Sequence, residues 1–386
     1  MLQGVRVLDC GAWGVGPCAC AWLGCLGADV IRLEPPRLDG LYHSGTMQKG
    51  AGTMYISSHY NKRNIIVDLK TAEGREVALR LAETADILIE NHPAGDMDKL
   101  GFGYESVRAI NPRIIYCSSS SYGRTGPLAH RPSADTYMQA GSGFASLTGK
   151  PGSQGQLYRY VVQIDWMTSL FAFQGVLLAL LAREVTGEGQ KVDTSQLEAA
   201  LALQSTKIAD YFATGVSPKP MGSADPNIVP SEAFRTYGGK YITVSVPREE
   251  YWPKLCSALG LEELEHDPKF ISNAERVKNR DVLIPILREK FLEEPARWWL
   301  ILLPRCDVPC APCNTYDDVI RDPHITHNRM IVNLETPWGK SLFSDFPVKF
   351  SKAPRPVEVR APVKPDANRE EILAEIGIAN RQGDNA

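Results

Sequence analysis

The segment Val5–Asp9, with the sequence VRVLD, predicts a short β-strand, and a glycine-rich turn, Gly11–Pro17 (GAWGVGP), follows it directly. A helical pattern then runs to Leu26, and a second strand pattern occupies Asp29–Glu34. The alternation continues with helices at Thr71–Thr84 and Ser106–Ile110 and strands at Ile65–Asp68, Asp86–Glu90 and Arg113–Ser118. Strands that alternate with helices predict an α/β fold, in which a mostly parallel sheet carries helices on both faces.

The turn at Gly11–Pro17 matches a dinucleotide-binding turn only in part. Its glycines follow the spacing G-x-x-G-x-G rather than G-x-G-x-x-G, and Pro17 removes a backbone N–H that would face a pyrophosphate. We therefore expect no NAD cofactor, although an NAD-dependent oxidoreductase stays an alternative class. Two other interpretations of this turn stay open. It can be a tight strand-to-helix turn that needs glycine, or a backbone surface that packs against another nucleotide-bearing ligand.

The composition of the 386 residues is that of an ordinary globular protein, with 44% hydrophobic and 23% charged residues. The net charge of -3 does not indicate a nucleic-acid partner. The most apolar run, Trp166–Ala182, is interrupted by polar residues and predicts a buried helix rather than a membrane span. The N-terminus lacks the pattern of a signal peptide, so we expect a cytoplasmic protein.

The nine cysteines are odd in number and show no small-domain disulfide pattern, which indicates a reduced protein. Two groups, Cys18–Cys25 and Cys306–Cys313, have spacings that invite a metal-site interpretation. In the second group, Pro309 and Pro312 stiffen an extended segment, whereas metal ligands must converge on one point. We expect no metal site.

Composition and turn signals divide the chain into parts. Residues 1–214 are expected to form a large domain and residues 215–231, rich in Pro, Gly and Ser, a linker. Residues 232–315 are expected to form a smaller α+β domain that opens with a hairpin turning at Gly238–Gly239, and residues 316–386 return to the large domain. Within the large domain, Asn61–Arg63 reads as a basic loop and Thr194–Ala213 as one helix.

Asp165 stands where a short apolar stretch meets the long helical run from Trp166 to about Arg183. A helix N-terminus presents unpaired N–H groups and a positive dipole end, which favour an ionised carboxylate. Such a carboxylate can be a nucleophile, and it can equally be an ordinary helix cap. The local sequence leaves both interpretations open.

Several motifs occur in an order that is more specific than any one of them. They are Leu2–Asp9, Gly16–Pro17, Leu26–Glu34, Asn61–Lys70, Ala85–Asn91, Lys99–Phe102, Asn111–Tyr116, Tyr122–Pro127, Gln139–Gly143 and Thr186–Asp193. With them the chain resembles the class III CoA-transferases, the family that includes formyl-CoA transferase, over nearly its whole length. The resemblance implies a large Rossmann-like domain with a parallel sheet, a smaller α+β domain, and interlocked dimers, with a heteromer as the alternative.

By this resemblance Asp165 corresponds to the family's nucleophilic aspartate. The implied reaction moves coenzyme A from an acyl-CoA to a carboxylic acid through a mixed anhydride and an aspartyl-CoA thioester, without ATP, metal or NAD. The position of Asp165 at a helix N-terminus suggests a nucleophile that stays ionised at neutral pH.

The resemblance also implies contacts to CoA. Val67 and Lys70 match positions at the adenosine and phosphate end, and Asn91, His92 and Lys99 match further contacts. Gly14 and Val15 match the loop that passes the thioester. Formyl-CoA transferase has a glutamine at the position of Gly14 and an adenine-end arginine at that of Pro35; Arg32 or Arg37 could replace the latter.

Two alternatives come from the same superfamily. The 2-methylacyl-CoA racemases place a histidine directly before an aspartate, whereas this chain has Ala134 before Asp135. Without that imidazole one of two bases is missing, so we favour the transferase, with Asp135 as a supporting residue. A CoA-binding partner subunit without activity is the second alternative, but it would not need Asp165.

Overall fold

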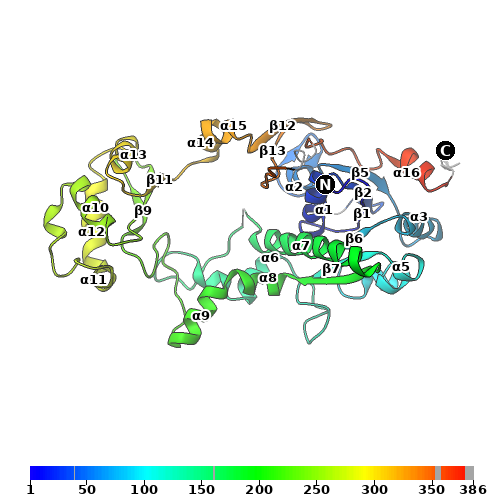
Figure 1. Ribbon diagram of the computed structural model, residues 1–386, viewed down its shortest axis with the longest axis horizontal. Helices are drawn as coiled ribbons and strands as arrows, with labels where there is room; N and C mark the ends of the chain where they lie inside the picture. The colour runs from blue at the N-terminus through cyan, green and yellow to red at the C-terminus, as the bar shows by residue number, and fades with distance from the viewer. Residues whose placement is uncertain (39, 160, 353–357, 379–386) are drawn as a thin grey trace. The chain divides into compact units, whose positions relative to one another are not determined.

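The computed structural model describes residues 1–38, 40–159, 161–352 and 358–378 (Figure 1). Two compact units divide the chain. The first comprises Met1–Phe144, Leu157–Val216 and His324–Ala386, and the second comprises Ala145–Gln156 and Ser217–Pro323. These units do not test the domain boundaries that we expect from the sequence, which stay a prediction.

A six-stranded, all-parallel sheet forms the centre of the first unit, in the order β5-β2-β1-β6-β7-β8. Its strands are β1 (Arg6–Asp9), β2 (Asp29–Glu34), β5 (Lys62–Ile66), β6 (Ile87–Glu90), β7 (Ile115–Ser120) and β8 (Gln190–Ser195). This sheet confirms the predicted α/β fold. Ligand sites in such sheets form at the carboxyl ends of the strands.

Helices cover both faces of the sheet, as the alternating pattern predicts (Figure 1). The residues Leu8, Leu88 and Tyr116 face a core built with α3 (Ala72–Glu83) and α5 (Tyr104–Ile110). Their strand neighbours Val7, Ile89 and Ile115 face a second core built with α1 (Val15–Cys25) and α7 (Gln163–Thr186). Strands buried on both faces explain the nearly continuous apolar runs of β1 and β6.

Shorter elements complete the first unit and the segment that leads back to it. They are β3 (Met47–Gln48), β4 (Ala51–Gly52), α2 (Thr53–Ser58), α4 (Asp96–Lys99), α6 (Asp135–Gly141), α8 (Gln196–Leu203), α9 (Ser205–Thr214), α15 (Pro323–His327), β12 (Ile331–Thr336), β13 (Gly339–Ser344) and α16 (Arg369–Glu375).

Two expectations about local structure are wrong. The single helix expected at Thr194–Ala213 is replaced by the end of β8, then α8 and α9, because residues 190–195 pair in parallel with β7. The basic loop expected at Asn61–Arg63 is the start of β5, and Lys62 is only 5% exposed. In both places tertiary pairing overrides a local pattern that reads differently.

The second unit is a small α+β fold. Its antiparallel sheet, in the order β11-β10-β9, consists of β9 (Ser231–Arg235), β10 (Tyr241–Ser245) and β11 (Cys310–Pro312). The helices are α10 (Tyr251–Leu259), α11 (Asn273–Lys278), α12 (Arg280–Phe291), α13 (Ala296–Arg305) and α14 (Tyr316–Arg321). The predicted hairpin is present, and both turn glycines, Gly238 and Gly239, have positive φ, at 80° and 85°. The core includes Phe234, Trp252 and Trp299.

Candidate active site

Asp165 is the third residue of α7 and lies in its first turn, where its side chain is partly exposed. It is not the cap of that helix. Asp135, the buried first residue of α6, accepts hydrogen bonds at Oδ1 from the backbone N–H groups of Ile164 (2.7 Å) and Asp165 (3.2 Å). Since Asp135 occupies the helix end, the carboxyl group of Asp165 is available for another role.

The two oxygens of the Asp165 carboxyl group have different surroundings. Oδ1 accepts a hydrogen bond from Nε2 of Gln196, the first residue of α8. Oδ2 faces the turn before α1, where a Cβ atom added to Gly14 would stand 3.3 Å from it. One oxygen is therefore held by a donor, and the other lies against a residue without a side chain.

The electrostatic setting corrects the expectation that the helix end keeps Asp165 ionised. Burial, and after it the nearby charge of Asp135, raise the pKa of Asp165 to about 7, although the hydrogen bond from Gln196 acts in the opposite direction. The physical reason is that burial disfavours the charged form, while Asp135 takes backbone donors of α7 and adds a like charge. A carboxyl group near half ionisation at neutral pH is typical of functional sites.

The glycine-rich turn beside Asp165 is tied to the end of β6 by two residues with expected CoA contacts. The side-chain amide of Asn91 bonds both backbone groups of Ala12, accepting from its N–H at 2.6 Å and donating to its carbonyl oxygen. His92 Nε2 lies 2.9 Å from the carbonyl oxygen of Cys10. The structure thus brings Asn91 and His92 to the turn that carries Gly14 and Val15.

The remaining expected CoA residues are spread along the same unit. Lys70 is exposed after β5, whereas Val67 is 6% exposed and belongs to the core. Lys99 on α4 is exposed and pairs with Asp96 at 2.8 Å. Their CoA contacts stay predictions. Arg32 is different, because its side chain is buried.

A buried charge network explains the burial of Arg32 and fixes the base of the turn. Arg32 pairs with Asp9 at 3.2 Å and with Glu34 at 3.1 Å, and Lys62 pairs with Asp9 at 2.7 Å. Although burial alone would raise it, the charges of Lys62 and Arg32 hold the pKa of Asp9 well below its usual range. Tyr55 donates to Glu34 at 2.9 Å. Two cations thus balance two carboxylates, and the guanidinium of Arg32 is engaged inside the fold rather than at a ligand surface.

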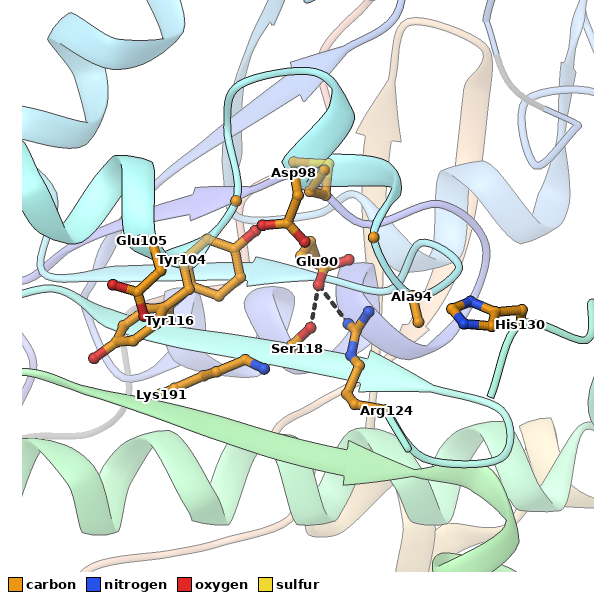
Figure 2. Close-up of a pocket in the computed structure, with 13 residues that line it drawn as sticks. Glu90, Ala94, Asp98, Tyr104, Glu105, Tyr116, Ser118, Arg124, His130 and Lys191 are labelled. Carbon is orange, nitrogen blue, oxygen red and sulfur yellow. Dashed lines mark hydrogen bonds and ion pairs between the residues drawn. The ribbon is translucent and has the colours of Figure 1, made fainter. Parts of the chain in front are cut away.

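A cavity of about 340 Å³ opens near the carboxyl ends of β6 and β7. Figure 2 shows Glu90 bonded to Ser118 and Arg124 in its wall. Its other labelled lining residues include Tyr116, Lys191 and His130. Tyr116 belongs to the core on the α3 and α5 face, whereas α7 packs on the opposite face. The cavity is therefore separate from Asp165.

The described ranges bear on two further expectations, the absence of a metal site and the absence of a membrane span. Among those residues, no group of three or more His, Cys, Asp or Glu side chains is placed to hold a metal ion. Among the same described residues, α7 is the one helix that is both long enough and apolar enough to cross a membrane, judged by length and composition alone. One face of α7 nevertheless packs in the core of the first unit through Ala172, Val176 and Ala179.

The chain combines a parallel α/β sheet, a small α+β unit and a partly buried aspartate beside a glycine-rich turn, and a carboxylate in such a setting can act as a nucleophile in acyl transfer. The family model for CoA-transferase family III matches residues 2–368, and the chain belongs to this family. It is therefore a CoA-transferase, and its family uses CoA thioesters as substrates.

Similar proteins span nearly the whole chain. Succinyl-CoA:glutarate CoA-transferase of Homo sapiens is 34% identical over 382 residues, which cover 97% of this chain and 86% of that protein. Acetyl-CoA:oxalate CoA-transferase of Acetobacter aceti is 32% identical, covering 90% of this chain and 89% of that protein. The crystal structure of a CaiB/BaiF family protein from Brucella suis superposes with a TM-score of 0.87 at 34% identity, covering 97% of this chain and 99% of that one.

Sequence reasoning missed Gln196, which the structure places on Asp165. It lay inside the helix expected at Thr194–Ala213 and carried no motif. A signal was present, since Ser195 and Glu198 have the spacing of a capping box, and Ser195 does accept from the N–H of Glu198 at 3.2 Å. That signal would have started a helix at Gln196.

Proposed function

We propose that this CoA-transferase moves coenzyme A from an acyl-CoA to a carboxylic acid through covalent intermediates on Asp165. The observation that carries the proposal is the setting of its carboxyl group: partly exposed, relieved of capping by Asp135, and placed between Gly14 and Gln196. The relatives named above support short dicarboxylic acids as the acceptor class, since their names pair succinyl-CoA with glutarate and acetyl-CoA with oxalate.

The reaction balances without a metal or a nucleotide triphosphate. An oxygen of Asp165 attacks the thioester carbon, the C–S bond breaks, and CoA thiolate leaves behind a mixed anhydride. The thiolate then attacks the carboxyl carbon of Asp165, which releases the donor acid and forms an aspartyl-CoA thioester. The acceptor carboxylate attacks the same carbon and displaces the thiolate, which finally attacks the acceptor's acyl carbon and frees Asp165.

The racemase alternative is less well supported. Ala134 stands directly before Asp135 and carries no imidazole, while His130 lines the cavity on the other side of the sheet. Proton exchange between two bases therefore lacks one partner at this position. Retention of an α-deuterium on the acyl-CoA during turnover in light water would agree with the transferase, and wash-out would favour the racemase.

Gly14→Ala is expected to lower kcat/KM for acyl-CoA by about 10-fold to 100-fold, because misplacement of reacting groups by roughly an ångström has effects of this size. The new methyl group would stand 3.3 Å from Oδ2 of Asp165, where the thioester must approach. The φ and ψ of Gly14, -63° and -45°, suit alanine, so the fold should persist.

A matched control for this substitution is Gly141→Ala, at the end of α6, where an added Cβ meets nothing within 4 Å. Both variants should keep the thermal stability of the parent, and Gly141→Ala should also keep its activity. If Gly14→Ala turns over like the parent, the thioester does not pass this turn.

The rate is expected to depend on pH through Asp165. Since its pKa is raised to about 7 and the ionised form attacks, kcat/KM should fall roughly tenfold for each unit of pH below that value. Measurement of kcat/KM for acyl-CoA across about pH 5 to 9 checks this. A profile that is flat down to about pH 5 would show an ordinary, low-pKa carboxylate and contradict the account.

We also propose that a second copy of this chain covers the outer face of α7. Leu178, Leu181 and Val185 recur at helical spacing and are 66%, 67% and 88% exposed. Such a face on a soluble protein marks an interaction surface, and the family resemblance implies interlocked dimers. Sedimentation equilibrium should give the mass of a dimer, reduced by Leu181→Glu; a monomer at micromolar concentration would contradict this.

A further inference from the structure

The hydrogen bond from Gln196 to Asp165 places a donor on an oxygen that the proposed reaction charges. In the first step one oxygen of Asp165 becomes bonded to the acyl group, and the other becomes the carbonyl oxygen of the anhydride. When CoA thiolate attacks the carboxyl carbon of Asp165, that carbonyl oxygen becomes the oxyanion of a tetrahedral intermediate. When the acceptor carboxylate attacks the same carbon, the same oxygen carries the charge again.

The two environments of the carboxyl group decide which oxygen this is. Oδ2 faces Gly14, whose missing side chain leaves room for the incoming thioester. Oδ1 accepts from Nε2 of Gln196. Attack through Oδ2 therefore leaves Oδ1, with its N–H donor already in place, as the oxygen that becomes charged in the two later steps.

Gln196 is held firmly enough to act in this way. Gln196 is 8% exposed and is the first residue of α8. The start of α8 is fixed by its cap, in which the hydroxyl oxygen of Ser195 accepts a hydrogen bond from the backbone N–H of Glu198. Ser195 in turn is paired with Ser120 in the parallel ladder of β7 and β8. A donor carried by a strand end and a helix start needs little reorganisation when charge develops.

We propose that Gln196 is a catalytic residue, whose side-chain amide stabilises the oxyanion that forms on Asp165 when the aspartyl-CoA thioester is made and when it is consumed. The inference rests on the proposed aspartyl intermediates. It also gives the buried amide of Gln196 a function beyond orienting Asp165.

The test is the rate at which the aspartyl-CoA adduct appears when excess enzyme is mixed with succinyl-CoA, acid-quenched and measured as intact protein mass. The pH should be about 9, where Asp165 is ionised in the parent. Gln196→Leu is expected to slow adduct formation by about 100-fold, the usual loss for one oxyanion donor, with succinyl-CoA affinity changed less than about threefold.

Gln204→Leu is the matched control. Gln204 is also buried, follows α8 directly, and donates to the carbonyl oxygen of Ala200 at 2.8 Å rather than to Asp165. This variant should form the adduct at the parent rate. Gln196→Glu, which keeps the shape but loses the donor at this pH, should be at least as slow as Gln196→Leu.

The possible outcomes distinguish failure of the proposed role of Gln196 from failure of the proposed reaction on Asp165. If Gln196→Leu forms the adduct at the parent rate at about pH 9, the inference is overturned. A variant that is slow only at neutral pH would show that Gln196 merely lowers the pKa of Asp165. If the parent forms no adduct on Asp165, the proposed function fails instead. A slow Gln196→Leu beside an unchanged Gln204→Leu supports the oxyanion role.

Discussion

Asp165→Ala should abolish CoA transfer, with kcat reduced by about 10⁴-fold or more, because loss of a covalent nucleophile removes the reaction path itself. Asp135, the carboxylate whose charge acts on Asp165, cannot take its place because it is committed to the N-terminus of α7 through the N–H groups of Ile164 and Asp165. Steady-state CoA transfer from an acyl-CoA to a short dicarboxylic acid, the proposed acceptor class, measures the effect, and binding of acyl-CoA should persist.

Removal of the Asp165 charge has a second expected effect, on stability, which Asp165→Asn tests. A carboxyl group whose pKa is raised in the folded state binds its proton more tightly there than in the unfolded chain. The stability that Asp165 contributes in this way is therefore lost as the pH rises from 3.8, the ordinary pKa, to about 7, the folded pKa. Above that range Asp165→Asn should therefore melt at a higher temperature than the parent. The exposed Asp210→Asn, on α9, is the control and should change neither activity nor melting. Retained activity in Asp165→Ala would contradict the covalent mechanism.

Lys62→Met is expected to lower the free energy of unfolding by about 3–5 kcal/mol, the usual loss when one partner of a buried ion pair is removed. Lys62 Nζ donates to Asp9 at 2.7 Å and to the carbonyl oxygen of Pro17 at 2.7 Å, and its residue is 5% exposed. Without it Asp9 keeps a buried charge with one cation fewer. Urea unfolding of the two proteins at neutral pH measures the difference.

The sign of the pH dependence follows from Asp9. Its folded pKa is depressed, so the stability it contributes is present above the ordinary value of 3.8 and is lost as pH falls toward the lower folded value. The effect of Lys62→Met should accordingly shrink in acid. Lys62→Met combined with Asp9→Asn should unfold less easily than Lys62→Met alone, because Arg32 and Glu34 remain a balanced pair.

Lys207→Met provides the surface comparison, since Lys207 pairs with Asp210 at 2.8 Å in an exposed setting. It should change the free energy of unfolding by no more than about 0.5 kcal/mol. Equal stability of Lys62→Met and Lys207→Met would mean that the buried network does not hold the base of the turn.

The fold was predictable where the signal is local. Strands β1, β2 and β6 are buried on both faces, so their apolar runs stand out, and Thr71 gives α3 a side-chain cap. Strand β8 was missed because it lies at the edge of the sheet and its sequence, QKVDTS, is mostly polar and exposed. An edge strand of this kind has no apolar alternation to detect.

The candidate site was predictable only in part, because its properties depend on contacts between distant segments. The place of Asp165 at the start of a helix followed from the sequence. That Asp135, thirty residues away, accepts hydrogen bonds from the first turn of this helix did not follow. Burial of Asp165, together with the charge of Asp135, raises the pKa that the helix end was expected to lower. The sequence around Lys62 predicts a solvent-exposed basic side chain, whereas the structure shows a buried ion pair between Lys62 and Asp9.

The most direct measurement is a chemical trap of the intermediate. The enzyme is incubated with succinyl-CoA and hydroxylamine, digested, and the peptide that contains Asp165 is examined by mass spectrometry. We expect a hydroxamate on Asp165 that depends on succinyl-CoA and is absent when CoA alone is supplied. An unmodified Asp165 in an enzyme that still transfers CoA, or a hydroxamate on another carboxyl group, would contradict it.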